Sequence, residues 1–258
     1  MLEDAVPCVR TLRYALDTST LYEAPPLVFD AEGVHFVLEN DLLVATLSTP
    51  LPSLMQARDL VSGVLANWTL ERQLVEGFAD FEFAYLGANM TGAVSDCKLD
   101  CPEREPLKNQ KRDQGSLIIS ISQYPNPPQI RASPELAAAS VRLSRSRIGV
   151  GESIQSVAYF VLTLAERQAG NRRAAATRYA VSREVLERIG RLASTRGDFG
   201  TARKAPRGEP ESLTQTVRAW IDNAVRRLLL QMGLVNGGHD PSLPCAIDVA
   251  HVTVRIRV

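Results

Sequence analysis

The chain has 258 residues, of which 45% are hydrophobic and 22% charged, so a largely disordered protein is excluded and a substantial core in one or two domains is expected. Its formal net charge is zero. However, residues 1–141 carry 10 basic and 19 acidic side chains, whereas residues 142–207 carry 14 basic and 5 acidic ones. This asymmetry predicts an acidic partner for the basic segment, either nucleic acid or the acidic segment of the same chain or of a second copy.

The cysteines and the longest apolar run indicate a cytoplasmic protein with no membrane partner. Four cysteines in a chain of this length form no dense disulfide framework. Cys97 and Cys101 have C-x3-C spacing, but a structural zinc site would need a second close pair, so no metal and no cofactor is predicted. The longest apolar run, 157–165, is about half the length that spans a bilayer.

In the first part of the chain, apolar and polar residues alternate as in β-strands, and one helical stretch interrupts this pattern. Ser53 is the predicted N-cap of that helix, whose apolar face continues to about Glu76. The predicted strands are 27–29, 34–38, 42–47, 81–86 and 116–123, with turn residues between the first three strands at 31–33 and 39–41. Residues 87–115 are polar and lack periodicity, so they are predicted to form a long exposed loop.

A proline-rich stretch, 125–132, is the predicted linker between an acidic α+β domain, 1–124, and a basic helical domain, 133–258. The second domain is predicted to contain helices over 133–147 and 152–169 and a helical pair over 172–194, followed by a basic loop. The next predicted helix begins at a capping box of Ser212 with Gln215 and ends near Met232, before Gly233. A final strand is predicted over 251–258. The expected fold class is α+β: an N-terminal mixed antiparallel sheet with one long helix, followed by a helical bundle and the final strand.

Residues 172–191 resemble the helix-turn-helix of DNA-binding proteins. Apolar or small side chains occupy the positions that this motif buries: Ala175, Tyr179, Val181, Leu186 and Ile189. The resemblance implies that residues near the start of the second helix lie against base edges, here Ser182, Arg183, Glu184 and Glu187. It also implies phosphate contacts from Arg172, Arg173, Arg178, Arg188 and Arg191. The basic residues of the following loop, Arg196, Arg203, Lys204 and Arg207, could extend that surface.

Two features depart from the motif. Ala180 stands where glycine is usual, although the turn requires a left-handed backbone. Glu184 and Glu187 place negative charge on the face that would read bases. Packing of this pair against the helix over 152–169, with the arginines merely solvated, explains the same apolar pattern without a ligand.

The whole order of elements resembles small uncharacterised bacterial proteins, and that resemblance implies no activity. No nucleophile, acid–base pair or cofactor motif is present, so no catalytic residue is predicted. The expected function is a non-enzymatic binding or regulatory protein that contacts DNA or RNA. The alternatives are a self-assembling interaction protein, in which the acidic and basic segments attract each other across a homo-oligomer, and an effector enzyme that uses the loop 87–115.

Overall fold

The computed structural model describes residues 7–77, 81–91, 120–195 and 213–241. These residues divide into two compact units. The first lies within the bounds Met1–Gln73 and Phe78–Pro128, and the second within Leu74–Gly77 and Gln129–Val258. The predicted α+β organisation is confirmed in its coarse form, with a five-stranded antiparallel sheet and one long helix, followed by five helices in the described part of the second unit.

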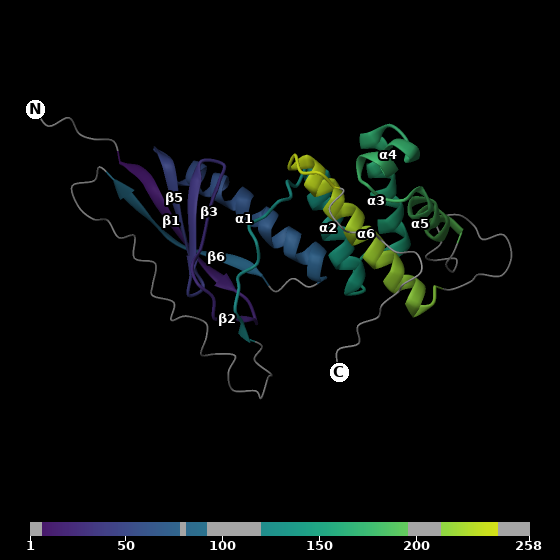
Figure 1. Ribbon diagram of the computed structural model, residues 1–258, viewed down its shortest axis with the longest axis horizontal. Coiled ribbons are helices and arrows are strands. Elements are labelled where there is room, and N and C mark those ends of the chain that lie inside the picture. Colours follow the sequence, from purple (N-terminus) through teal and green to yellow (C-terminus); the bar gives the residue numbers. More distant parts are fainter. Residues whose placement is uncertain (1–6, 78–80, 92–119, 196–212, 242–258) are drawn as a thin grey trace, which may run out of the picture. The chain divides into compact units, whose positions relative to one another are not determined.

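The first unit is built on a five-stranded antiparallel sheet in the order β3-β4-β5-β1-β6 (Figure 1). Its strands are β1 (Cys8–Asp17), β3 (Leu27–Ala31), β4 (Val34–Glu39), β5 (Leu42–Leu51) and β6 (Glu82–Thr91). The two hairpin turns that connect β3, β4 and β5 have positive φ at both central residues, Glu32 and Gly33 in one and Asn40 and Asp41 in the other. Such turns match the twist of the strands that they join, which explains why these short turn sequences set the register.

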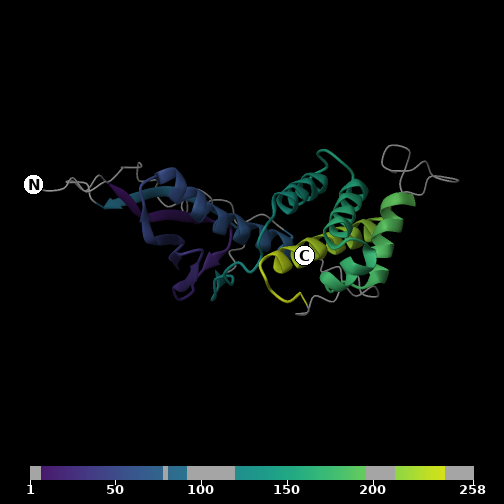
Figure 2. The same ribbon diagram turned by 90° about the horizontal axis from the view of Figure 1, so that it is seen from above.

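One face of the sheet is buried against helix α1 (Leu54–Glu76), which runs along it in Figure 2. Alternate residues of neighbouring strands share that face, because Phe36 and Leu12 both pair with Ala45. Trp68 of α1 is fully buried and lies in a cluster of phenylalanine rings. The predicted helix and its Ser53 cap are confirmed: the Ser53 hydroxyl accepts a hydrogen bond from the Gln56 amide at 3.4 Å.

The main differences from the predicted strands are that β1 and the two-residue β2 (Leu21–Tyr22) were not predicted and that β6 extends to Thr91. The sequence pattern missed β1 because a register shift between Val9 and Thr11 and another beside Arg13 interrupt its period of two. The predicted loop over 87–115 is wrong at its start, since residues 87–91 continue β6 and pair with β1 through their backbone. A separate parallel pair joins β2 (Leu21–Tyr22) to β7 (Ser120–Ile121), which lies inside the predicted strand 116–123.

The described helices of the second unit are α2 (Pro134–Arg147), α3 (Ile154–Ala169), α4 (Arg172–Arg178), α5 (Arg183–Thr195) and α6 (Gln215–Asn236). Helix α3 confirms the helix predicted over 152–169, and it is the central helix of this unit because it packs against α2, α4, α5 and α6 (Figure 1). The side chains of Ser133 and Ser153 accept hydrogen bonds from the amides of the first turns of α2 and α3. These caps satisfy amides that have no partner inside their helix.

Helix α6 begins and ends differently from the prediction. Its cap is Thr214 rather than a box that starts at Ser212, because the Thr214 hydroxyl accepts the Val217 amide at 3.3 Å. The helix also continues through Gly233 to Asn236. A Cβ at position 233 would lie 2.9 Å from the Cβ of Ile130, so this glycine allows close packing and does not end the helix.

Several predictions lie outside the described residues: the final strand 251–258, the basic loop after α5, most of the loop 87–115, and Cys97 with Cys101. Within the described ranges, no helix is both long and apolar enough to span a membrane. The same ranges contain no group of three or more His, Cys, Asp or Glu side chains positioned to hold a metal ion.

Candidate nucleic-acid interface

The turn between α4 and α5 contains one residue with a left-handed backbone. Ala180 adopts φ +47°, the left-handed conformation for which glycine is usual. The turn is closed by two hydrogen bonds, from the Val181 amide to the Ala176 carbonyl at 3.0 Å and from the Ala180 amide to the Thr177 carbonyl at 3.4 Å. The Ser182 hydroxyl then accepts the Val185 amide at 3.2 Å and caps α5.

The inner face of this helical pair is packed tightly. The five positions that the motif buries are buried here, and four of them (Ala175, Tyr179, Leu186 and Ile189) are fully inaccessible. The Tyr179 hydroxyl donates a hydrogen bond to Oε1 of Gln168 on α3 at 3.0 Å, and burial raises the pKa of this hydroxyl, so it remains a donor at neutral pH. A Cβ at Gly190 would lie 3.1 Å from the Leu162 side chain, which shows how closely α5 approaches α3.

The outer face of α5 is exposed and carries both signs of charge. Ser182, Arg183, Glu184, Glu187 and Arg191 are all exposed. On this face, Nε of Arg183 donates to Oε1 of Glu187 at 2.7 Å, and their side chains are 67% and 48% exposed. The helix therefore buries one side in the bundle and presents arginines and glutamates on the other.

Three of the predicted phosphate-binding arginines hold the bundle together. Arg172 donates to Glu166 at 2.6 Å, across the turn that joins α3 to α4, and its guanidinium lies beside Gly190. The guanidinium of Arg188 lies over the ring of Trp220 on α6, 4.5 Å from the ring centroid. Arg178 donates to the Gln168 carbonyl near the end of α3 at 2.8 Å.

Sequence reasoning could not find these partners. Glu166 is six residues from Arg172, on the other side of Gly170, where α3 ends with φ +97°. Two residues that are six apart do not contact each other within one helix, where neighbouring side chains are three or four residues apart. Only the turn geometry brings the two side chains together.

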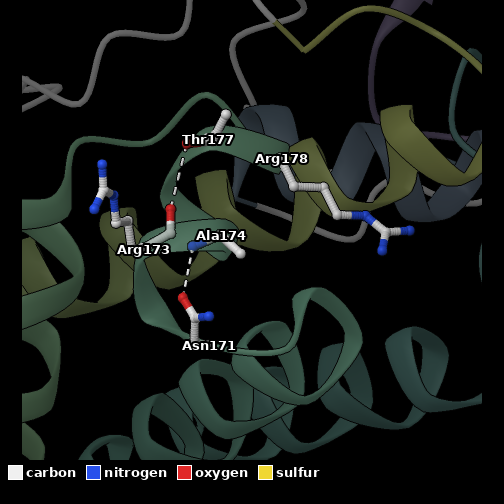
Figure 3. Close-up of a pocket in the computed structure, with 5 residues that line it drawn as sticks. All are labelled: Asn171, Arg173, Ala174, Thr177 and Arg178. Atoms are coloured by element: carbon white, nitrogen blue, oxygen red, sulfur yellow. Dashed lines mark hydrogen bonds between the residues drawn. The ribbon is translucent and has the colours of Figure 1, made fainter.

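The outer surface of α4 contains a shallow open depression of about 430 Å³ (Figure 3). It is lined by Asn171, Arg173, Ala174, Thr177 and Arg178. The Asn171 side chain is occupied in capping α4, since its Oδ1 accepts the Ala174 amide at 2.9 Å. The Arg173 and Arg178 side chains extend away from the helix in opposite directions (Figure 3), and the Arg173 guanidinium bonds to no described residue.

The predicted surface residues thus form two sets. Arg173, Arg183 and Arg191 are exposed on α4 and α5, and Arg178 is exposed but also bonded to the end of α3. Arg172 and Arg188 are partly covered by their packing partners. Arg203 and Lys204 lie outside the described residues. Residues 172–195, which contain α4 and α5, carry six arginines and two glutamates. The two helices therefore remain basic after the Arg183–Glu187 ion pair is counted.

No protein-family model, curated protein or solved structure matches the chain significantly.

Proposed function

We propose that the protein is a non-enzymatic binding protein that contacts duplex DNA through α4 and α5, with the exposed face of α5 in the major groove. The observation that carries this proposal is the left-handed turn at Ala180, which turns α5 so that its apolar side meets α3 and its charged side remains exposed. An α-helix fits the major groove of B-DNA, which is about 12 Å wide, whereas the major groove of duplex RNA is deep and narrow. We also propose a cytoplasmic location.

The arginines support the proposal in separate ways. Arg173, Arg178 and Arg191 are exposed at the borders of the presented face and are suited to phosphate contacts. Arg172 and Arg188 contribute indirectly, because they hold α4 and α5 against neighbouring helices. A binding helix that is fixed in this way loses less conformational entropy when it docks.

Salt dependence gives the proposal a magnitude. If three arginines each neutralise one phosphate, the logarithm of the binding constant falls with the logarithm of salt concentration at a slope of about −2.7. Between about 50 mM and 200 mM salt, this slope corresponds to a loss of affinity of about 40-fold. Retention of duplex DNA at low salt and its loss over this range are therefore expected.

The test compares charge reversals of equal size. Arg173→Glu and Arg183→Glu should each weaken binding by more than tenfold at low salt. Arg145→Glu, an exposed arginine on α2, makes the same change in net charge and should have a much smaller effect. Arg188→Glu is unsuitable because it would also remove a packing contact with Trp220. If the wild-type protein retains no duplex at low salt, or if all three variants bind alike, the proposal fails.

The same salt series separates this proposal from self-assembly. If the acidic and basic segments attract each other across subunits, the mass measured by light scattering should rise as salt is lowered in the absence of DNA. A mass that is constant with salt, combined with salt-sensitive DNA retention, supports the proposed function over the alternative.

A further inference from the structure

The Arg183–Glu187 pair at the start of α5 is poorly explained as a helix-stabilising contact. Arg183 is the first residue of α5, where the positive end of the helix dipole disfavours a cation. An ion pair over four residues is also weaker when the basic residue precedes the acidic one, as here. With both side chains largely exposed, such a pair is worth about 0.5 kcal/mol or less. The pair therefore stabilises the fold little and can rearrange at little cost.

The hydrogen-bonding groups that the pair leaves open are the relevant feature. The bond to Glu187 uses the Nε–H of Arg183 and Oε1 of the carboxylate. A guanidinium has five N–H groups, so the four on its two Nη atoms remain, together with Oε2 of Glu187. No other described residue bonds to either side chain. The pair thus presents a row of donors beside an acceptor on the exposed face of α5.

This arrangement matches one base pair in the major groove. Guanine presents two acceptors there, N7 and O6, and the cytosine paired with it presents the N4 amino donor beside them. Adenine and thymine present a different order of groups, with a methyl at one edge. Phosphates repel a carboxylate on the reading face, and a hydrogen bond that the carboxylate accepts from a base offsets this repulsion. The cytosine amino group is the usual donor to a carboxylate in the major groove.

We propose that the Arg183–Glu187 pair reads a single G·C base pair, with the guanidinium donating to guanine N7 and O6 and the carboxylate accepting from cytosine N4. This inference rests on the proposed function and adds base specificity to it. It assigns a role to Glu187, whose negative charge a purely phosphate-binding surface would not explain. Glu187, rather than being an obstacle to DNA binding, suppresses binding to sequences without a cytosine at that position.

The experiment selects binding sites from a random duplex DNA library, with the full chain as wild type and as variants. Wild-type sites should share one G·C pair at a fixed position. Arg183→Ala should reduce the preference for that pair by about 5- to 150-fold, the range expected for one good bidentate base contact. Glu187→Gln should reduce the preference by a smaller factor, because its contact is single and glutamine keeps a neutral acceptor. Both side chains are exposed, so these variants should remain folded, which circular dichroism checks.

Two variants serve as controls. Glu184→Gln removes the same negative charge from the same exposed face but leaves the Arg183–Glu187 pair intact, so it should raise affinity for all duplexes and keep the base preference. Arg173→Ala should weaken binding to all sequences equally and reduce the salt slope by about 1. These controls separate the effect of a changed net charge from the loss of the preference for a G·C base pair.

The outcomes are distinguishable. Retention of duplex DNA without a G·C preference, or an unchanged preference in Glu187→Gln, overturns this inference and leaves the proposed function standing. Failure to retain any duplex overturns the proposed function and the inference with it. A preference lost equally in Glu184→Gln and Glu187→Gln also overturns the inference, because it would assign the effect to charge alone.

Discussion

Replacing Ala180 with glycine tests the turn that orients α5. Ala180 has φ +47° and an exposed side chain, so Ala180→Gly removes a strained Cβ without losing buried contacts. The left-handed conformation costs a non-glycine residue about 1–2 kcal/mol. Glycine in turn costs about 0.4–1 kcal/mol through the greater freedom of the unfolded chain. The expected net effect is an increase of about 0.5–1 kcal/mol in the free energy of unfolding.

This increase is measurable by thermal and denaturant unfolding followed by circular dichroism. For a chain of this size, 1 kcal/mol shifts the Tm by about 2–4 °C, so a rise of roughly 1–4 °C is expected. Ala176→Gly, inside α4, is the matched control and should lower stability by about 1 kcal/mol, since helix interiors disfavour glycine. Ala180→Val should also be destabilising, because a β-branched side chain tolerates this φ least.

If Ala180→Gly is as destabilising as Ala176→Gly, the left-handed backbone at Ala180 is contradicted. Position 180 would then behave as an ordinary helical or extended residue, and α5 would not be turned as described. An increase in stability without a change in DNA retention would agree with the proposed function, because the outer face of α5 is unaltered.

Three further changes test the packing of the second unit. Tyr179→Phe removes the hydrogen bond to Gln168 and should lower the free energy of unfolding by about 1 kcal/mol in a denaturant titration, with an unchanged value contradicting the bond. Gly190→Ala places a Cβ 3.1 Å from the buried Leu162 side chain. This overlap should outweigh the gain in helix propensity and lower the free energy of unfolding by about 1 kcal/mol. A stabilised variant would show that α3 and α5 are less tightly packed. Hydrogen bonds from an arginine of α2 lower the pKa of Glu152 below its ordinary value of 4.5, so the stability that this carboxylate contributes is complete above that value and is lost as pH falls through the lowered pKa. Glu152→Gln should therefore cost about 0.5 kcal/mol at neutral pH and flatten the acid limb of a stability–pH curve, and an acid limb identical to that of the wild type would contradict this assignment.

Local sequence pattern predicted the elements whose neighbours in the chain decide their structure. The hairpin turns at Glu32-Gly33 and Asn40-Asp41, the Ser53 cap and the central helix α3 depend on contacts within a few residues. The burial of the inner-face positions of α4 and α5 was also expected, because a helical period places them on one side. These features follow from backbone preference and amphipathic spacing.

Long-range pairing explains where the pattern was insufficient. Strand β1 was missed because its irregular register follows the partners β5 and β6, which lie far away in the sequence. Gly233 is typical of a helix end, yet it lies within α6 because Ile130 packs against it. In both places a tertiary contact outweighs a local preference.

For the candidate interface, the sequence by itself determined that the helical pair is basic and which side of each helix is apolar. It also showed that Ala180, Glu184 and Glu187 depart from the motif. Only the tertiary structure decided which arginines are engaged in packing: Glu166 and Trp220 hold Arg172 and Arg188, whereas Arg178 bonds to Gln168 and stays exposed. Composition sets the charge of a segment, whereas three-dimensional packing determines which charged groups can still meet a ligand.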